Sequence, residues 1–320
     1  MQRMAGRDDS LWKAILEDVM DDFLRFFYPE AEALFDFSAG FVFLDKELQA
    51  LFPETEGRAS PRYVDKLAKV LTREGAEQWI LIHIEVQSYP DKHFPERMFH
   101  YYYRILDRYR RPVTAFAIYT GKGKKRLPDS YEHTFLGTRI SYRYNTCQLS
   151  LQPEDALLSS NNPFALVALI AKTAIDSGRA PDKVLLERKL NLAKLLLERD
   201  IPVRKVRSIL QFLKSYIRFG DIGNYANFEI QLDTVTNTKK QTMGIEEFLA
   251  ERAREEERAA AKKQLERIEK RAEKRVQAQL ERIVRNLIRN TDFPDKKIAR
   301  IAGASHDFVA QVREKYAPAG

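Results

Sequence analysis

The clearest alternation of apolar and polar positions lies in residues 62–88. Two extended segments, RYVDKLAKVLT and QWILIHIEVQS, flank a short polar stretch that contains a glycine. Alternation with a period of two, together with β-branched and aromatic residues, predicts a β-hairpin. If the turn takes five residues, 73–77, Thr72 pairs with Gln78. The residue numbers of any two cross-strand partners in the hairpin then sum to 150.

A second pattern follows directly. The segment FPERMFHYYYRILDRYRR (94–111) has apolar residues at helical spacing, and PVTAFAIYT (112–120) is a continuous apolar run before a Gly/Lys loop. A strand, a helix and a buried strand in succession predict a crossover connection and an α/β sheet. The stretch HTFLGTRISYRYNTCQL (133–149) predicts one more strand pair or an irregular extended segment.

The remaining patterns are helical. Residues Ser10 to Phe27 predict a helix with Ser10 as its N-cap, and three helical patterns follow Pro153. Residues 244–290 are rich in Glu, Lys and Arg with a sparse apolar stripe, which predicts a long charged helix or coiled coil. The last segment reads as helix, Gly-Ala-Ser turn and helix, the outline of a helix-turn-helix.

We therefore expect four parts in the chain. They are an α/β domain at 1–150, a helical subdomain at 151–243, the long charged helix at 244–290 and the small C-terminal piece at 291–320. The long helix is expected either to join modules or to pair two chains. The C-terminal piece is either a structural unit or a DNA reader.

Composition limits the classes of partner and of site that the chain can have. A formal net charge of +8 and a pI near 9.3 favour an anionic partner, with nucleic acid before membrane. The sole cysteine, Cys147, excludes an intramolecular disulfide and a Cys-rich zinc cluster. The apolar runs are too short to cross a bilayer and the N-terminus does not resemble a secretory signal, so we expect a cytoplasmic protein without a membrane partner.

Two carboxylates, Asp65 and Glu85, are the candidate ligands of a metal site. Side chains alternate along a strand, so His83, Glu85 and Gln87 belong to one face of the hairpin. The pairing that sums to 150 sets Asp65 opposite Glu85. Facing carboxylates are costly unless a cation lies between them, and Mg²⁺ prefers oxygen ligands completed by water and phosphate. This deduction depends on the register, because a slip of one residue removes it.

These residues also carry a family resemblance. An Asp on one strand, a Glu-x-Gln 20 residues later at the end of the next strand, and then FPERMFHYYYRILDRY and VTAFAIYT resemble the PD-(D/E)XK nuclease family transposases, also called Rpn or YhgA-like. The similarity extends from about Ser10 to Cys147. The segment TMGIEEFLAERAREEE also resembles the region that follows the nuclease domain in this group.

The resemblance implies a restriction-endonuclease-like α/β core, a mixed four-stranded sheet flanked by helices, followed by an α-helical C-terminal region. It implies Asp65 and Glu85 as ligands of Mg²⁺ or Mn²⁺, with no small-molecule cofactor. Gln87 stands where the wider superfamily has a lysine, and an amide can only hydrogen-bond or supply an oxygen. An acid from the first helix is also implied; Glu17 is the candidate, with Asp18 or Asp21 as alternatives.

Two functions remain open on the sequence alone. The first is a metal-dependent DNA endonuclease, linked to recombination or mobile elements, that binds DNA and pairs with a second copy through residues 244–290. The alternative is a non-catalytic DNA-binding or assembly protein that keeps the nuclease fold as a scaffold. The basic loop GKGKKR (121–126) lacks P-loop spacing; it either contacts a nucleic-acid backbone or is simply solvated.

Overall fold

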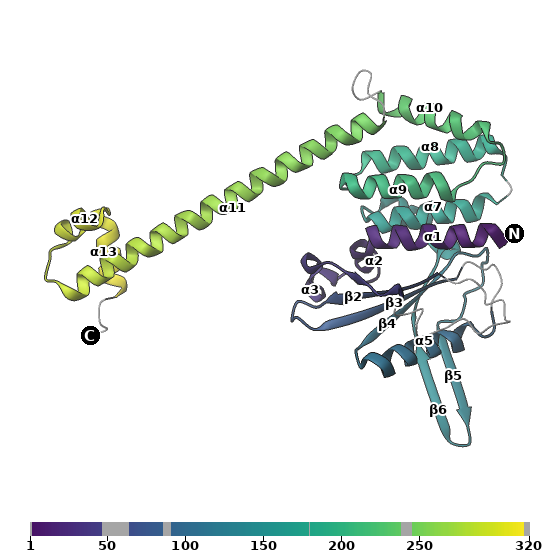
Figure 1. Cartoon of the computed structure of the whole chain (residues 1–320), viewed down its shortest axis with the longest axis horizontal. Helices are drawn as coiled ribbons and strands as arrows, with labels where there is room; N and C mark the ends of the chain where they lie inside the picture. The colour runs from purple at the N-terminus through teal and green to yellow at the C-terminus, as the bar shows by residue number, and fades with distance from the viewer. Residues whose placement is uncertain (1, 47–63, 86–90, 179, 238–244, 317–320) are drawn as a thin grey trace. The chain divides into compact units, whose positions relative to one another are not determined.

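The computed structural model describes residues 2–46, 64–85, 91–178, 180–237 and 245–316. It is a mixed α/β structure that divides into two compact units, Met1–Leu249 and Ala250–Gly320 (Figure 1). Among the described residues, no helix has both the length and the apolar composition needed to cross a membrane.

A five-stranded sheet lies at the centre of the first unit, in the order β1-β2-β3-β4-β7. The β1–β2 and β2–β3 pairs are antiparallel, whereas β3–β4 and β4–β7 are parallel. Helix α5 (Phe94–Tyr109) connects β3 to β4, so the predicted crossover is confirmed. The strands are β1 (Val42–Phe43), β2 (Val64–Leu71), β3 (Glu77–Glu85), β4 (Val113–Tyr119) and β7 (Asn145–Gln148).

The turn between β2 and β3 is shorter than the sequence pattern suggested. Thr72 N donates to Ala76 O at 2.8 Å, which leaves only residues 73–75 in the loop. Gly75 has a φ of 82°, the left-handed conformation that closes three-residue hairpin loops. A loop of three residues, rather than five, shifts the pairing of the two strands by two positions.

The predicted register is therefore wrong. Asp65 pairs with His83, not with Glu85, and Thr72 does not pair with Gln78. Because the shift is an even number of residues, it does not exchange the two faces of the strands. Asp65, His83 and Glu85 still occupy positions of one face, with Asp65 and Glu85 on a diagonal.

Different helices cover the two faces of the sheet (Figure 1). On one face, Phe23 of α2 (Met20–Phe27) packs against Phe116 of β4, with ring centroids 5.0 Å apart. On the other face, Met98 and Ile105 of α5 share a buried cluster with Leu67 of β2. Alternation then assigns the odd-numbered positions of β2 and β4 to the α5 face.

The first helix differs from its prediction. Ser10 lies inside α1 (Gln2–Asp18) and is not an N-cap. Residues 2–9 contain no proline and extend the helix toward the N-terminus. The break comes later, at Val19, before α2 begins. Two short elements follow, α3 (Ala31–Leu34) and the 3-10 turn η1 (Phe37–Ala39).

Strands β5 (Ser130–Phe135) and β6 (Thr138–Arg143) form a separate two-stranded sheet. The sequence offered a strand pair or an irregular segment there, and the strand pair is confirmed. In Figure 1 the hairpin extends past α5. The 3-10 turn η2 (Leu149–Leu151) follows β7.

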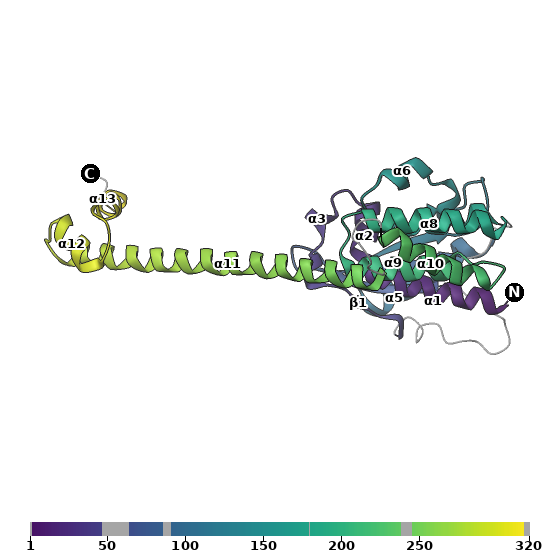
Figure 2. The ribbon, with the colours of Figure 1, turned by 90° about the horizontal axis from the view of Figure 1, so that it is seen from above.

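A helical layer completes the first unit, and Figure 2 views it from above. Helix α7 lies innermost, and every residue from 164 to 172 is buried. The three predicted helical patterns correspond to α7, α8 and α9. The layer contains α6 (Glu154–Ser159), α7 (Pro163–Ser177), α8 (Asp182–Glu198), α9 (Val203–Tyr216) and α10 (Gly223–Asn237).

A buried lysine ties this layer together. Lys189 of α8 is fully buried and donates hydrogen bonds to Lys214 O and Ile217 O, both at 2.9 Å. These carbonyls lie at the C-terminal end of α9, where helix carbonyls lack intrahelical partners. Burial lowers the pKa of Lys189 to about 8. This ammonium therefore satisfies helix-end acceptors inside the subdomain.

The second unit contains most of α11 (Ile245–Asn290), followed by α12 (Asp295–Ala302) and α13 (His306–Lys315). Gly303, with a φ of 64°, ends α12, and Ser305 caps α13 by accepting a hydrogen bond from Phe308 N at 3.2 Å. The predicted helix, turn and helix are thus present. Val284, Ile298, Val309 and Val312 form their common core with α11.

Candidate functional site

The ends of four strands meet at one edge of the central sheet. β3, β4 and β7 run parallel and end there, while the antiparallel β2 begins there. In one register row Glu85 neighbours Tyr119, which in turn neighbours Gln148. Ligand sites of parallel sheets lie at such carboxyl ends. The sequence candidates therefore fall where the topology favours a binding site.

Asp65 and Glu85 are brought together at this edge by backbone register. Asp65 pairs with His83, and Glu85 follows two positions along the same face. Diagonal positions across an antiparallel pair are about 7–8 Å apart and within reach of long side chains. Two carboxylate residues at this spacing suit the oxygen-ligand preference of Mg²⁺ or Mn²⁺. Gln87 lies outside the described residues.

The structure describes no further metal-ligand cluster. Among the side chains that it describes, no group of three or more His, Cys, Asp or Glu residues is placed to hold a metal ion. The side chains of Asp65 and Glu85 are not among them.

Glu17 bonds to the residue next to Asp65 in the chain. Lys66 is fully buried, and its Nζ contacts the carboxylate of Glu17 and donates to Asp45 Oδ2 at 2.8 Å. Alternation puts Lys66 and Asp65 on opposite faces of β2. A buried ammonium is tolerated only with partners. Glu17 therefore anchors α1 to β2, while its own side chain stays half exposed.

Sequence reasoning missed Lys66. The one hint in the sequence was the position of Lys66 in its strand. Lys66 lies on the same face as Ala68 and Val70, which are buried. A lysine on the buried face of a strand predicts an acidic partner for its ammonium group. Glu17 and Asp45 lie 49 and 21 residues away in the chain, so the pattern could not identify them.

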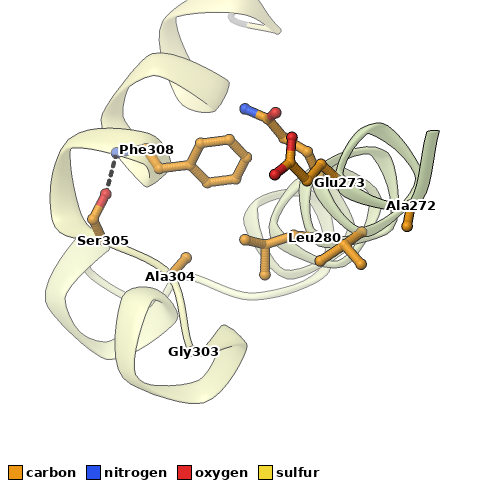
Figure 3. Close-up of a pocket in the computed structure, with 9 residues that line it drawn as sticks. Ala272, Glu273, Leu280, Gly303, Ala304, Ser305 and Phe308 are labelled. Atoms are coloured by element: carbon orange, nitrogen blue, oxygen red, sulfur yellow. Dashed lines mark hydrogen bonds between the residues drawn. The ribbon is translucent and has the colours of Figure 1, made fainter. Parts of the chain in front are cut away.

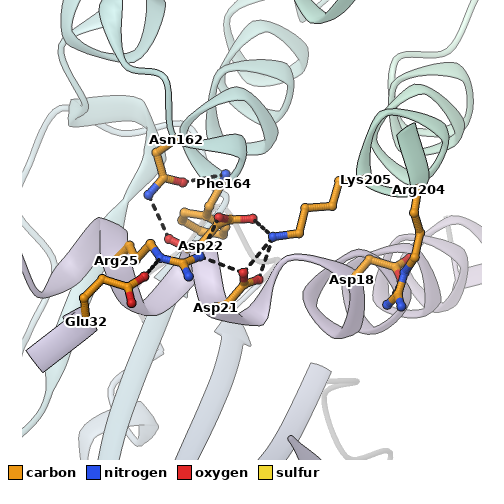
Figure 4. A network of polar contacts seen from close by, with 9 residues as sticks. All are labelled: Asp18, Asp21, Asp22, Arg25, Glu32, Asn162, Phe164, Arg204 and Lys205. Atoms are coloured by element: carbon orange, nitrogen blue, oxygen red, sulfur yellow. Dashed lines mark hydrogen bonds and ion pairs between the residues drawn. The ribbon is translucent and has the colours of Figure 1, made fainter. Parts of the chain in front are cut away.

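The alternatives to Glu17 belong to an ion-pair network that joins the first two helices to α9 (Figure 4). Asp21 accepts hydrogen bonds from Arg25 Nη1 at 2.6 Å and from Lys205 Nζ at 2.8 Å. Asp18 pairs with Arg204 at 3.1 Å. The structure thus engages both acids in contacts that hold helices together, not at the strand edge.

Burial and ion pairing have opposite effects on the pKa values of the acids in this network. Desolvation acts to raise the pKa of Asp21, but the hydrogen bonds from Lys205 and Arg25 outweigh it and hold that pKa below its ordinary value. In Asp22, which is 5% exposed, burial prevails and the pKa is raised despite the bond from Lys205 at 2.5 Å. Lys205 and Arg25, which both contact Asp21 and Asp22, are therefore the cations that let these carboxylates lie inside the interface.

A basic loop borders the strand edge. Gln148, at the end of β7 and buried, donates to Gly123 O at 3.2 Å and Lys125 O at 3.0 Å. Its Oε1 accepts from Leu127 N at 3.1 Å. One side chain thus fixes residues 123–127, while Lys122, Lys124, Lys125 and Arg126 remain exposed. The loop directly follows Tyr119, the strand neighbour of Glu85.

The comparisons with known proteins identify the class. Residues 48–215 match the model of the family described as "Putative transposase, YhgA-like". The matched segment contains Asp65, Glu85 and Gln87 and extends into α9. The chain belongs to this family. A search of curated proteins gave no match, and neither did a search of solved structures.

The ion-pair network gives a stability prediction. Replacing Lys205 by Met removes one of the two cations that Asp21 and Asp22 share and leaves only Arg25 beside them. We expect Lys205→Met to lower the free energy of unfolding by about 2–3 kcal/mol, measured by urea denaturation. The neighbouring Arg204→Met removes a pair whose arginine is 78% exposed and costs less than about 1 kcal/mol. Equal losses in the two variants would contradict this account.

Proposed function

We propose that the chain is a metal-dependent DNA endonuclease with its reaction centre at the edge formed by Asp65 and Glu85. The observation that carries the proposal is the register, which sets these two residues on one face where the parallel strands end. Family membership supports it, because a transposase family is associated with mobile elements and hence with DNA processing.

The mixed sheet is a second support. Its β1–β2 and β2–β3 pairs are antiparallel and its β3–β4 pair is parallel, which agrees with the mixed four-stranded sheet flanked by helices that the resemblance to PD-(D/E)XK nucleases implies. The sheet has a fifth strand, β7, in addition to the four implied ones. Through Gln148 this extra strand fixes the basic loop at the edge of the sheet where β3 also ends.

Each residue has a proposed role. Asp65 and Glu85 hold Mg²⁺ or Mn²⁺, which when bound lowers the pKa of a water and neutralises phosphate charge. Gln87 orients water or substrate through its amide, since it cannot supply the positive charge of a lysine. Glu17 acts through Lys66 as a positioning residue for the start of β2. The basic loop contacts the DNA backbone.

Removal of the two carboxylates tests this function. We expect Asp65→Asn and Glu85→Gln each to reduce nicking of supercoiled plasmid in Mg²⁺ or Mn²⁺ on the order of 100-fold or more. Glu74→Gln is the matched control, because Glu74 is an exposed acid in the turn at the far end of the same hairpin. Nicking by Asp65→Asn at the rate of the Glu74→Gln control would refute the proposal.

The alternative function is a non-catalytic DNA-binding or assembly protein, and one observation on α11 bears on assembly under either function. Its apolar side chains are exposed: Leu265 by 56%, Ile268 by 55% and Val276 by 65%. Apolar and alanine positions follow one another at spacings of three, four and seven residues, which keeps them on one face of the helix. The stripe consists of Leu265, Ile268, Ala272, Val276 and Ile283, and Leu287 beyond it packs against the core formed with α12 and α13.

The stripe continues into a groove of the second unit (Figure 3). This groove has a volume of about 580 Å³ and is lined by Val276 and Leu280 of α11 and by Phe308 of α13. Figure 3 shows the Phe308 ring extending toward α11. We infer that α11 of a second copy packs along the stripe. Such a dimer serves either function, because cutting a duplex needs two reaction centres.

Sedimentation tests the dimer. We expect the wild-type chain to sediment at twice its mass of 37.3 kDa, and Ile268→Glu to give the monomer because a carboxylate in the apolar seam is desolvated without a partner. The control is Ala278→Glu, which adds the same charge on the opposite side of α11 and should leave the dimer intact. A wild-type monomer would refute this pairing.

A further inference from the structure

An aromatic ladder runs from α5 onto the β5–β6 hairpin. The ring of Tyr103 stacks on Phe99 with centroids 6.2 Å apart and planes at 23°, and Phe99 stacks on Tyr131 at 5.3 Å and 21°. Tyr131 continues to His133 at 6.4 Å and 12°. Near-parallel planes along four rings are unlike the edge-to-face contacts of Phe23 in the core. The two ends of the ladder, Tyr103 and His133, are exposed, while Phe99 and Tyr131 between them are partly buried against the core.

The ladder leads to an apolar hairpin tip. Phe135 is next on the face of Tyr131 and His133, and it is 65% exposed. Leu136 is 89% exposed and has a φ of 42°, followed by Gly137 at 84°. A two-residue turn with both φ values positive favours Asn-Gly, and a leucine is strained there. Backbone strain at an exposed apolar residue marks this tip as a candidate contact site.

The segment that contains the ladder has a strongly positive net charge. Residues 94–143, from α5 to the end of β6, contain eleven Lys or Arg and four Asp or Glu, a formal charge of +7. The whole chain has a formal charge of +8. Arg139 and Arg143 of β6 are 73% and 80% exposed at their side chains. An apolar protein partner would not require this charge, but a phosphate backbone does.

We propose that the β5–β6 hairpin is a stacking platform for the unpaired bases of a DNA strand. Phe135 and Leu136 insert next to the bases, the ring ladder continues the stack, and the basic residues hold the backbone. Aromatic rings and a positive surface together are how proteins bind single strands without reading sequence. The proposal rests on DNA as the substrate of the proposed function, and it adds that the substrate includes a strand-separated segment.

Binding of a fluorescent oligothymidine to the full-length protein tests the platform. Fluorescence anisotropy is measured in EDTA, so that cleavage cannot occur. We expect Phe135→Ala to weaken binding about fivefold or more, the lower end of what loss of one stacked base produces. Leu136→Gly removes the exposed side chain while relieving the backbone strain, so it should fold and still bind more weakly. Ile222→Ala, at a site that is 85% exposed, is the control.

Two further variants separate stacking from apolar contact. Phe135→Trp should keep the wild-type affinity because it keeps a ring, whereas Phe135→Leu, which keeps apolar contact but loses stacking, should bind more weakly than the wild type. The salt dependence should not change in these variants. Lys124→Ala and Lys125→Ala, by contrast, should change the salt dependence. A plot of the logarithm of the binding constant against the logarithm of the salt concentration should become less steep by about 0.7 for each lost phosphate contact.

Several results would overturn the platform. They are wild-type affinity in Phe135→Ala, wild-type affinity in Phe135→Leu, or a duplex of equal length bound as tightly as the single strand. Self-association of the wild type that Phe135→Ala abolishes, without oligothymidine binding, would assign the tip to a protein contact. The nuclease proposal is tested separately: Asp65→Asn should bind oligothymidine normally, so loss of cleavage and loss of stacking can be told apart.

Discussion

The parallel pairing of β3 with β4 is the constraint on which the candidate site depends. It sets the ends of β3, β4 and β7 at one edge, and the β2–β3 hairpin brings the start of β2 to the same place. The register of this hairpin makes Asp65 and Glu85, 20 residues apart in the chain, diagonal neighbours, and the parallel pairing puts them at the edge where β4 and β7 end. Without the crossover through α5, Glu85 would not lie beside the strand that leads into the basic loop.

Buried charges hold the frame around this edge. Lys66 joins β2 to Glu17 of α1 and to Asp45, while Lys205 joins α9 to Asp21 and Asp22 of α2. Each lysine is largely removed from water, so each contact requires its acidic partners to be present. The acids near the N-terminus that the sequence offers as catalytic candidates thus have defined structural partners. Glu17 alone among them reaches the strand that carries Asp65.

Periodicity predicted the elements well and their pairing less well. The apolar runs in β3, α5, β4 and α7 determine their own conformation because burial selects one period. The register was missed because loops of three and five residues leave the same side chains on the same face, so only the left-handed Gly75 distinguishes them. Lys66 and the aromatic ladder could not be predicted, since both depend on contacts between segments distant in the chain. The family resemblance and the candidate acids Asp65 and Glu85 were predictable, because they belong to short motifs that can be recognised in the sequence without knowledge of distant contacts.

The most direct test of the central claim is a structure of the protein with Mn²⁺ bound, in which anomalous scattering locates the ion. The account predicts one peak ligated by the carboxylates of Asp65 and Glu85, and loss of that peak in Asp65→Asn. Full Mn²⁺ loading with the ion bound elsewhere, or a peak that persists unchanged in Asp65→Asn, would contradict it.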